Sequence, residues 1–127
     1  MSHKWIKAVF FASAVYDGVL GLGFLFCAHC IFGYFGVTLP NHMAYVQFPA
    51  LLLIIFAIMF FQISRDPVRY RDYMLYGMGL KVAYIGIVLG YHWTSGIPSM
   101  WLPWAYIDIV FLIAFILAWT STRTVHK

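Results

Sequence analysis

The chain has 127 residues, of which 64% are hydrophobic, 20% aromatic and only 9% charged. Ordinary soluble domains contain about 45–50% apolar and about 25% charged residues, so these few charges cannot cover a water-facing surface. The composition excludes that class and indicates lipid as the solvent for most of the chain. The net charge of +4 does not indicate nucleic-acid binding, because the basic residues form no continuous patch, and two cysteines are too few for a secreted disulfide scaffold.

Four stretches of the chain carry the roughly 20 largely apolar residues that a membrane-spanning helix needs. In chain order we expect them at about residues 6–30, 46–64, 73–93 and 101–121. Pro49 and Pro103 then fall in the opening turns of the second and fourth spans, where a helix tolerates proline. The sequence predicts an all-α, integral-membrane bundle of four transmembrane helices that forms a single membrane domain over residues 1–127.

The basic residues are distributed unevenly about these spans. The loops at about 36–45 and 94–100 contain none, whereas seven of the eight fall at the opposite ends of the spans: Lys4, Lys7, Arg65, Arg69, Arg71, Arg123 and Lys127. The positive-inside rule therefore predicts that both termini are cytoplasmic.

The same topology places further residues at the two membrane interfaces. Three loop arginines would contact the head groups of anionic membrane lipids: Arg65, Arg69 and Arg71. Tryptophans would form aromatic belts, with Trp5 and Trp119 at the inner interface and Trp93, Trp101 and Trp104 at the outer one.

A cleaved signal peptide is the alternative interpretation of the first apolar stretch. The stretch is longer than the apolar region of a signal peptide, it contains Asp17, and it lacks a small-residue cleavage site. We therefore expect it to be a membrane span.

Small residues at four-residue spacing predict where helices approach closely, since membrane helices associate through tight packing. They are Ala14 with Gly18 in the first span, and Gly79 with Ala83 and Gly86 with Gly90 in the third. We expect the closest contacts of the bundle between these two spans. The same faces would also suit a dimer interface, and the pattern does not separate the two.

Three ionisable residues, Asp17, Lys81 and Asp108, lie within the predicted spans. At a rise of about 1.5 Å per residue, their side chains reach a common level near the middle of the membrane. A single charge there costs at least about 2.5–3.5 kcal/mol, so we expect Lys81 to bridge both aspartates. The tyrosines beside these residues in the sequence would complete a polar cluster: Tyr16, Tyr84 and Tyr106.

This cluster has two interpretations. As a functional site, it would relay protons or cations, or hold the polar head group of a ligand. As a structural feature, it would be a buried ion cluster that sets the register of the helices. The sequence leaves both open.

Five residues that can bind metal ions or undergo redox chemistry are expected on the outer side: Cys27, His29, Cys30, His42 and His92. A C-x-x-C pair binds soft metal ions or cycles between dithiol and disulfide, and imidazoles would complete a copper or zinc site. An oxidising outer compartment also allows a simple local disulfide. A third interpretation is that the cysteines only pack and the histidines lie at a wet interface.

Four short strings in the chain carry a family resemblance: Asp17–Gly23, Gln47–Ala50, Arg65–Pro67 and Leu80–Lys81. In this order they resemble the small four-helix bacterial membrane proteins grouped as DoxX-like. Some members of that group accompany membrane redox systems that exchange electrons with quinone. The resemblance implies a bacterial inner membrane and an accessory role beside a quinone-linked enzyme, and it transfers no catalytic residue.

These observations lead to three functional hypotheses. The first is an accessory protein or subunit of a larger, quinone-linked redox assembly, in a membrane complex or homo-oligomer. The second is a small proton-coupled carrier or lipophilic-ligand-binding membrane protein that uses Asp17, Lys81 and Asp108. The third is a thiol/quinone redox enzyme that uses Cys27 and Cys30. The first ranks ahead because no P-loop, dinucleotide-binding, Ser-His-Asp or H-E-x-x-H pattern occurs in the sequence.

Overall fold

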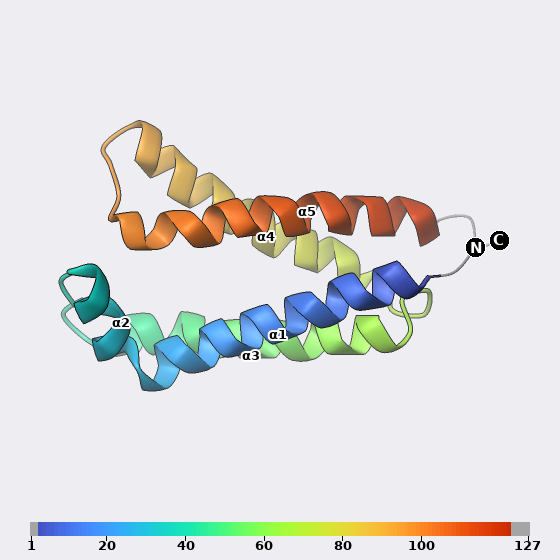
Figure 1. The fold of residues 1–127 in the computed structure, drawn as a ribbon, viewed down its shortest axis with the longest axis horizontal. Helices are drawn as coiled ribbons and strands as arrows, with labels where there is room; N and C mark the ends of the chain where they lie inside the picture. The colour runs from blue at the N-terminus through green and yellow to red at the C-terminus, as the bar shows by residue number, and fades with distance from the viewer. Residues whose placement is uncertain (1–2, 123–127) are drawn as a thin grey trace.

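The computed structural model describes residues 3–122, and all regular structure in that range is helical (Figure 1). Five α-helices follow one another, with a short 3-10 helix before the last: α1 (Lys4–Phe26), α2 (Ala28–Phe35), α3 (Ala44–Arg65), α4 (Tyr73–Trp93), η1 (Ser99–Trp101) and α5 (Leu102–Thr122). Four of them, α1, α3, α4 and α5 together with η1, are long and apolar enough to cross a membrane. The prediction of an all-helical chain with four candidate spans is confirmed.

The long helices have apolar outer surfaces. Large hydrophobic side chains such as Val19, Ile55 and Val110 are well exposed there. Helices satisfy their backbone hydrogen bonds internally, which is the condition for crossing lipid. These surfaces therefore fit a multi-pass membrane protein whose helices face hydrocarbon.

Two helix boundaries differ from the sequence prediction. The first span ends at Phe26 and not near residue 30, because the backbone turns at Cys27 (φ −131°, ψ 33°) before α2 begins. Helix α3 begins at Ala44, so Pro49 lies in its second turn and not in its first. The prediction for Pro103 is confirmed, since it is the second residue of α5.

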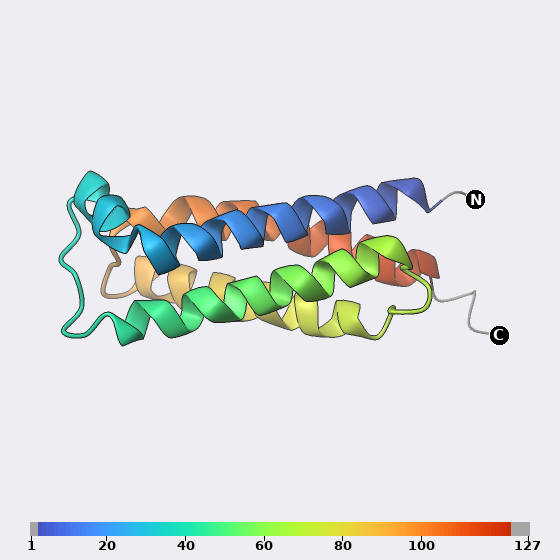
Figure 2. The ribbon, with the colours of Figure 1, turned by 90° about the horizontal axis from the view of Figure 1, so that it is seen from below.

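The helices pack as two pairs, α1 along α3 and α4 along α5 (Figures 1 and 2). The pairs meet through sparser contacts of α1 with α5 and of α3 with α4. The start of α1 and the end of α5 lie at one end of the bundle, which we call the basic end (Figure 1). The opposite end, with α2 and residues 36–43 and 94–101, is the distal end. Arg123 and Lys127, which contributed to the predicted orientation, lie outside the described residues.

The expected close contact between the first and third spans is wrong. Helix α1 turns its small residues toward α3: a Cβ on Gly21 would lie 2.8 Å from the carbonyl oxygen of Ala50. On α4, Cβ atoms at Gly79, Gly86 and Gly90 would meet nothing within 4 Å. The reason is that α4 directs its other face, which carries Lys81, into the bundle.

The basic end is filled by a hydrophobic core. Its buried members come from all four long helices: Ile6, Phe10, Phe60, Ile63, Met74, Phe115 and Ala118. The rings of Phe10 and Phe115 stack at 4.4 Å between centroids, and the Phe60 ring lies 5.2 Å from that of Phe115. This core closes the basic half of the bundle.

Arg71 joins the start of α4 to the end of α5, and its assignment to lipid head groups is wrong. It is buried, its Nη2 donates to the Trp119 carbonyl oxygen at 2.9 Å, and its Nε donates to Thr122 Oγ1 at 2.9 Å. The guanidinium also lies 4.1 Å from the centre of the Trp119 ring. The last carbonyl groups of a helix have no hydrogen-bond partner within the helix. The guanidinium of Arg71 supplies donors to one of them, and its positive charge is favourable at a helix C-terminus. Arg65 and Arg69 are exposed, and their contact with lipid stays a prediction.

Gly21→Ala tests the close approach of α1 to α3. The new Cβ would meet a backbone oxygen that cannot rotate away, so we expect the free energy of unfolding to fall by about 1–3 kcal/mol. Gly18→Ala is the matched control, since its Cβ would lie 3.6 Å from the Ala57 Cβ, an ordinary contact. Unfolding in a denaturing detergent, followed by circular dichroism, measures both. Equal effects of the two substitutions would contradict the observed packing.

Arg71→Ala tests the link between α4 and α5. Loss of charge-assisted hydrogen bonds should lower the free energy of unfolding by about 2 kcal/mol, measured in the same way. Arg69→Ala, an exposed arginine of the same loop, should change it by less than about 0.5 kcal/mol. A wild-type stability for the Arg71 variant would show that this link does not stabilise the bundle.

Candidate functional site

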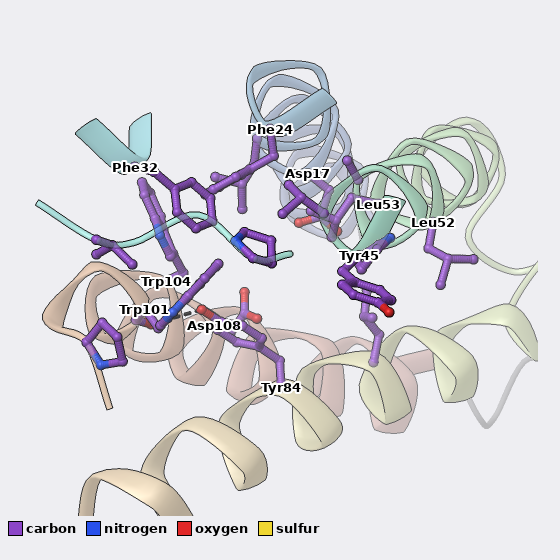
Figure 3. Close-up of a pocket in the computed structure, with 18 of the residues that line it drawn as sticks. Asp17, Phe24, Phe32, Tyr45, Leu52, Leu53, Tyr84, Trp101, Trp104 and Asp108 are labelled. Atoms are coloured by element: carbon purple, nitrogen blue, oxygen red, sulfur yellow. Dashed lines mark hydrogen bonds between the residues drawn. The ribbon is translucent and has the colours of Figure 1, made fainter. Parts of the chain in front are cut away.

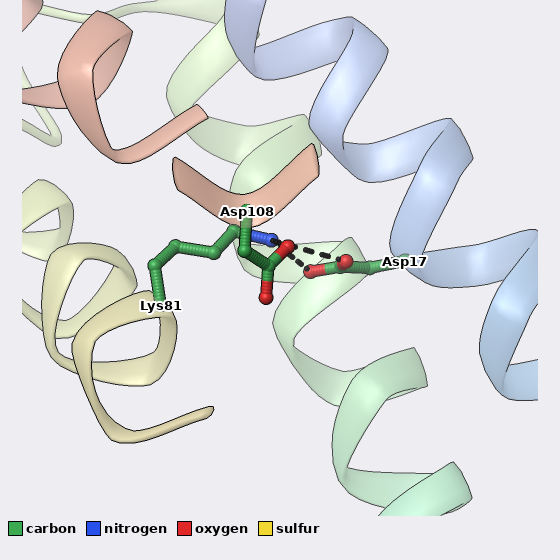
Figure 4. Close-up of polar contacts among 3 residues, drawn as sticks. All are labelled: Asp17, Lys81 and Asp108. Carbon is green, nitrogen blue, oxygen red and sulfur yellow. Dashed lines mark hydrogen bonds and ion pairs between the residues drawn. The ribbon is translucent and has the colours of Figure 1, made fainter. Parts of the chain in front are cut away.

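The three ionisable residues of the spans meet inside the bundle (Figure 4). Lys81 Nζ lies 3.2 Å from Asp17 Oδ1, 3.4 Å from Asp17 Oδ2 and 3.1 Å from Asp108 Oδ1. The residues come from α4, α1 and α5, and at most 7% of each residue is exposed. The structure thus places Lys81 between both aspartates, as the sequence predicts. We call this set the ion cluster.

Aromatic rings enclose the ammonium group of the ion cluster. Lys81 Nζ lies 5.3–6.0 Å from the ring centres of four residues: Tyr16, Phe60, Phe111 and Phe115. The negative face of an aromatic ring attracts a cation, and the attraction grows when water is excluded. The rings therefore add to the carboxylates in compensating the charge of Lys81.

A cavity of about 560 Å³ lies between the two helix pairs, in the distal half of the bundle (Figure 3). Its walls are mainly aromatic and aliphatic, with side chains such as Phe24, Leu53, Leu80 and Trp101. Its charged lining residues are those of the ion cluster, which forms its floor. A concave, apolar space of this size with a few convergent polar groups is typical of small-molecule sites.

The chain builds the distal wall of this cavity from the segment after α1. Phe32 of α2 and Val37 of the following loop both line it, and the rings of Phe24 and Phe32 pack against Trp101. Exposed Tyr45 belongs to the rim. Toward the basic end, the floor rests on the core of Phe60 and Phe115.

The structure separates the three predicted tyrosines. Tyr16 and Tyr84 line the cavity, and the Tyr84 hydroxyl donates to the Trp101 carbonyl oxygen at 2.9 Å. Tyr106 is 52% exposed and does not line the cavity, so its assignment to the polar cluster is wrong. Two residues along a helix are about 200° apart, so Tyr106 faces away when Asp108 faces inward.

Two polar atoms of the cavity lining are buried with no hydrogen-bond partner in the part of the chain that the structure describes: Tyr16 Oη and Trp104 Nε1. Their side chains line the cavity, and their rings are 6.3 Å apart. Trp104, expected at the outer membrane interface, is a lining residue that the sequence motifs do not indicate. The available signal was its position four residues before Asp108, which places both on one face of α5.

The cysteines and histidines do not converge. Cys27 and Cys30 form a disulfide, which agrees with the simple local disulfide among the alternatives. His29, His42 and His92 are exposed, and within residues 3–122 no group of three or more His, Cys, Asp or Glu side chains could hold a metal ion. The structure therefore does not form the predicted metal site. Neither cysteine lines the cavity.

No protein-family model matches this chain, and no curated protein and no solved structure matches it. The DoxX-like resemblance and the quinone-linked role that it implies stay predictions.

Lys81→Met tests the contribution of the ion cluster to folding. The substitution leaves two buried carboxylates without their cation, so the free energy of unfolding should fall by about 3–5 kcal/mol. Replacing all three charges together (Asp17→Asn, Lys81→Met and Asp108→Asn) should recover most of this loss, because no buried charge then lacks a partner. A Lys81→Met protein as stable as the wild type would contradict a structural role for the cluster.

Proposed function

We propose that this protein binds an amphiphilic small molecule, with the apolar part in the cavity and the polar head group at the ion cluster. The observation that carries the proposal is the composition of the cavity lining. About 560 Å³ of space is bounded by aromatic and aliphatic side chains, and its charged residues are Asp17, Lys81 and Asp108. Apolar walls with one polar end match a molecule with one apolar and one polar part.

The structure favours one-sided binding over transport across the bundle. The core around Phe10, Phe60 and Phe115 fills the basic half, directly beneath the ion cluster. A carrier would need a second, open path through this core. The cavity by contrast reaches the distal end through the side chains of its rim.

The positive-inside rule supports a cytoplasmic basic end, so the cavity would face the non-cytoplasmic side. The inner membrane of a bacterium is the location that the DoxX-like resemblance implies. A ligand-binding role is compatible with a subunit of a larger assembly, which stays a prediction. The thiol/quinone enzyme is less favoured, because the Cys27–Cys30 disulfide does not line the cavity.

The experiment is native mass spectrometry of the detergent-solubilised protein with an equimolar mixture of dodecanol, dodecylamine and dodecanoate. We expect a saturable one-to-one adduct with at least one of these probes. Leu53→Trp should abolish the adduct, because the larger ring fills the cavity that Leu53 lines.

Leu22→Trp is the matched control, since Leu22 is exposed on the outer surface of α1 and does not line the cavity. This variant should bind as the wild type does. The absence of any saturable adduct, or the same loss in both variants, would overturn the proposed function.

A further inference from the structure

The hydrogen-bonding capacity of the cavity floor limits which head group it can take. The ammonium group of Lys81 is already shared by two carboxylates, with Nζ 3.2 and 3.4 Å from the two oxygens of Asp17 and 3.1 Å from Asp108 Oδ1. Among the described residues, Lys81 is also the one basic residue that lines the cavity. An anionic head group would therefore find no unpaired cation, and it would be repelled by two carboxylates that share a single ammonium.

Asp108 presents the remaining acceptor. Its Oδ1 accepts from Lys81, while its Oδ2 has no hydrogen bond from the described residues. The side chain of Asp108 is 10% exposed, against 1% for those of Asp17 and Lys81. Asp108 is thus the most accessible member of the floor, and its second oxygen is open to a donor from a head group.

Two further donors of the lining, Tyr16 Oη and Trp104 Nε1, are buried without a hydrogen-bond partner among residues 3–122. The Tyr16 ring lies 5.5 Å from Lys81 Nζ and 6.3 Å from the Trp104 ring, so these donors adjoin the ion cluster. Leaving a buried donor unpaired costs about 1–3 kcal/mol. A head group that accepts hydrogen bonds would remove this cost, whereas an ammonium group has no acceptor to offer.

We infer that the cavity selects an uncharged, hydroxyl-bearing amphiphile, an alcohol or a phenol, whose O–H donates to Asp108 Oδ2 and whose oxygen accepts from Tyr16 or Trp104. This inference rests on the proposed ligand-binding function and specifies its ligand class. A hydroxyl group is both donor and acceptor, and it brings no charge into the membrane interior. A carboxylate or phosphate lacks a counterion at this floor, and an alkylammonium leaves the two buried donors unpaired.

The experiment compares dodecanol, dodecylamine and dodecanoate individually at neutral pH, by titration in native mass spectrometry. The three probes share one apolar chain, so differences in dissociation constant report on the head group. We expect dodecanol to bind at least about tenfold more tightly than either charged probe, which corresponds to about 1.4 kcal/mol.

Conservative variants locate the head group. Tyr16→Phe removes one hydroxyl and should weaken dodecanol binding about fivefold to tenfold, the loss expected for one hydrogen bond. Tyr106→Phe is the matched control, because Tyr106 is exposed and does not line the cavity. Trp104→Phe and Trp93→Phe form a second such pair, with Trp93 exposed at the end of α4.

The outcomes separate the two proposals. Tighter binding of dodecylamine or dodecanoate than of dodecanol would overturn the hydroxyl inference while leaving a ligand-binding cavity. Unchanged dodecanol affinity in both the Tyr16 and the Trp104 variants would also overturn it. If none of the three probes binds, the proposed function fails, and this inference fails with it.

Discussion

Lys81 of α4 pairs with Asp17 of α1 and Asp108 of α5 inside the bundle, at 3.1–3.2 Å. Each of these charges would carry a large free-energy cost if it lay unpaired in a membrane. The cost is offset only when α1, α4 and α5 are rotated so that the three side chains meet. That requirement sets the rotation of three helices about their own axes. It also accounts for the small-residue face of α4 lying on the outer surface, since the face with Lys81 must point inward.

The ion cluster also divides the bundle into two halves with different packing. Between the ion cluster and the basic end, large aromatic side chains such as Phe60 and Phe115 fill the space, and their rings also lie near the ammonium of Lys81. Between the ion cluster and the distal end, the two helix pairs leave a cavity that α2 and the loops close only in part. The boundary between the filled core and the cavity therefore coincides with the ion cluster, so the cavity has apolar walls and one charged end.

Much of the fold follows from the sequence, whereas only part of the site does. The four long apolar helices and the meeting of Asp17, Lys81 and Asp108 were predicted correctly, because helix length and the level of a residue along its helix depend on the local rise of about 1.5 Å per residue. Tyr106 was assigned wrongly and Trp104 was not recognised as a lining residue, because the side chain that meets the cavity depends on helix rotation. Arg71 was assigned to lipid because nothing near it in the sequence shows that its partners are at the end of α5.

The number of long apolar helices and the pairing of the three buried charges were thus predictable from the sequence. These properties are set by composition and by distance along a single helix. The tertiary structure decided that α1 pairs with α3, that Arg71 caps α5, and that a cavity opens above the ion cluster. The reason is physical: helix pairing and cavities depend on how side chains of separate helices fit together, and no single segment carries that information.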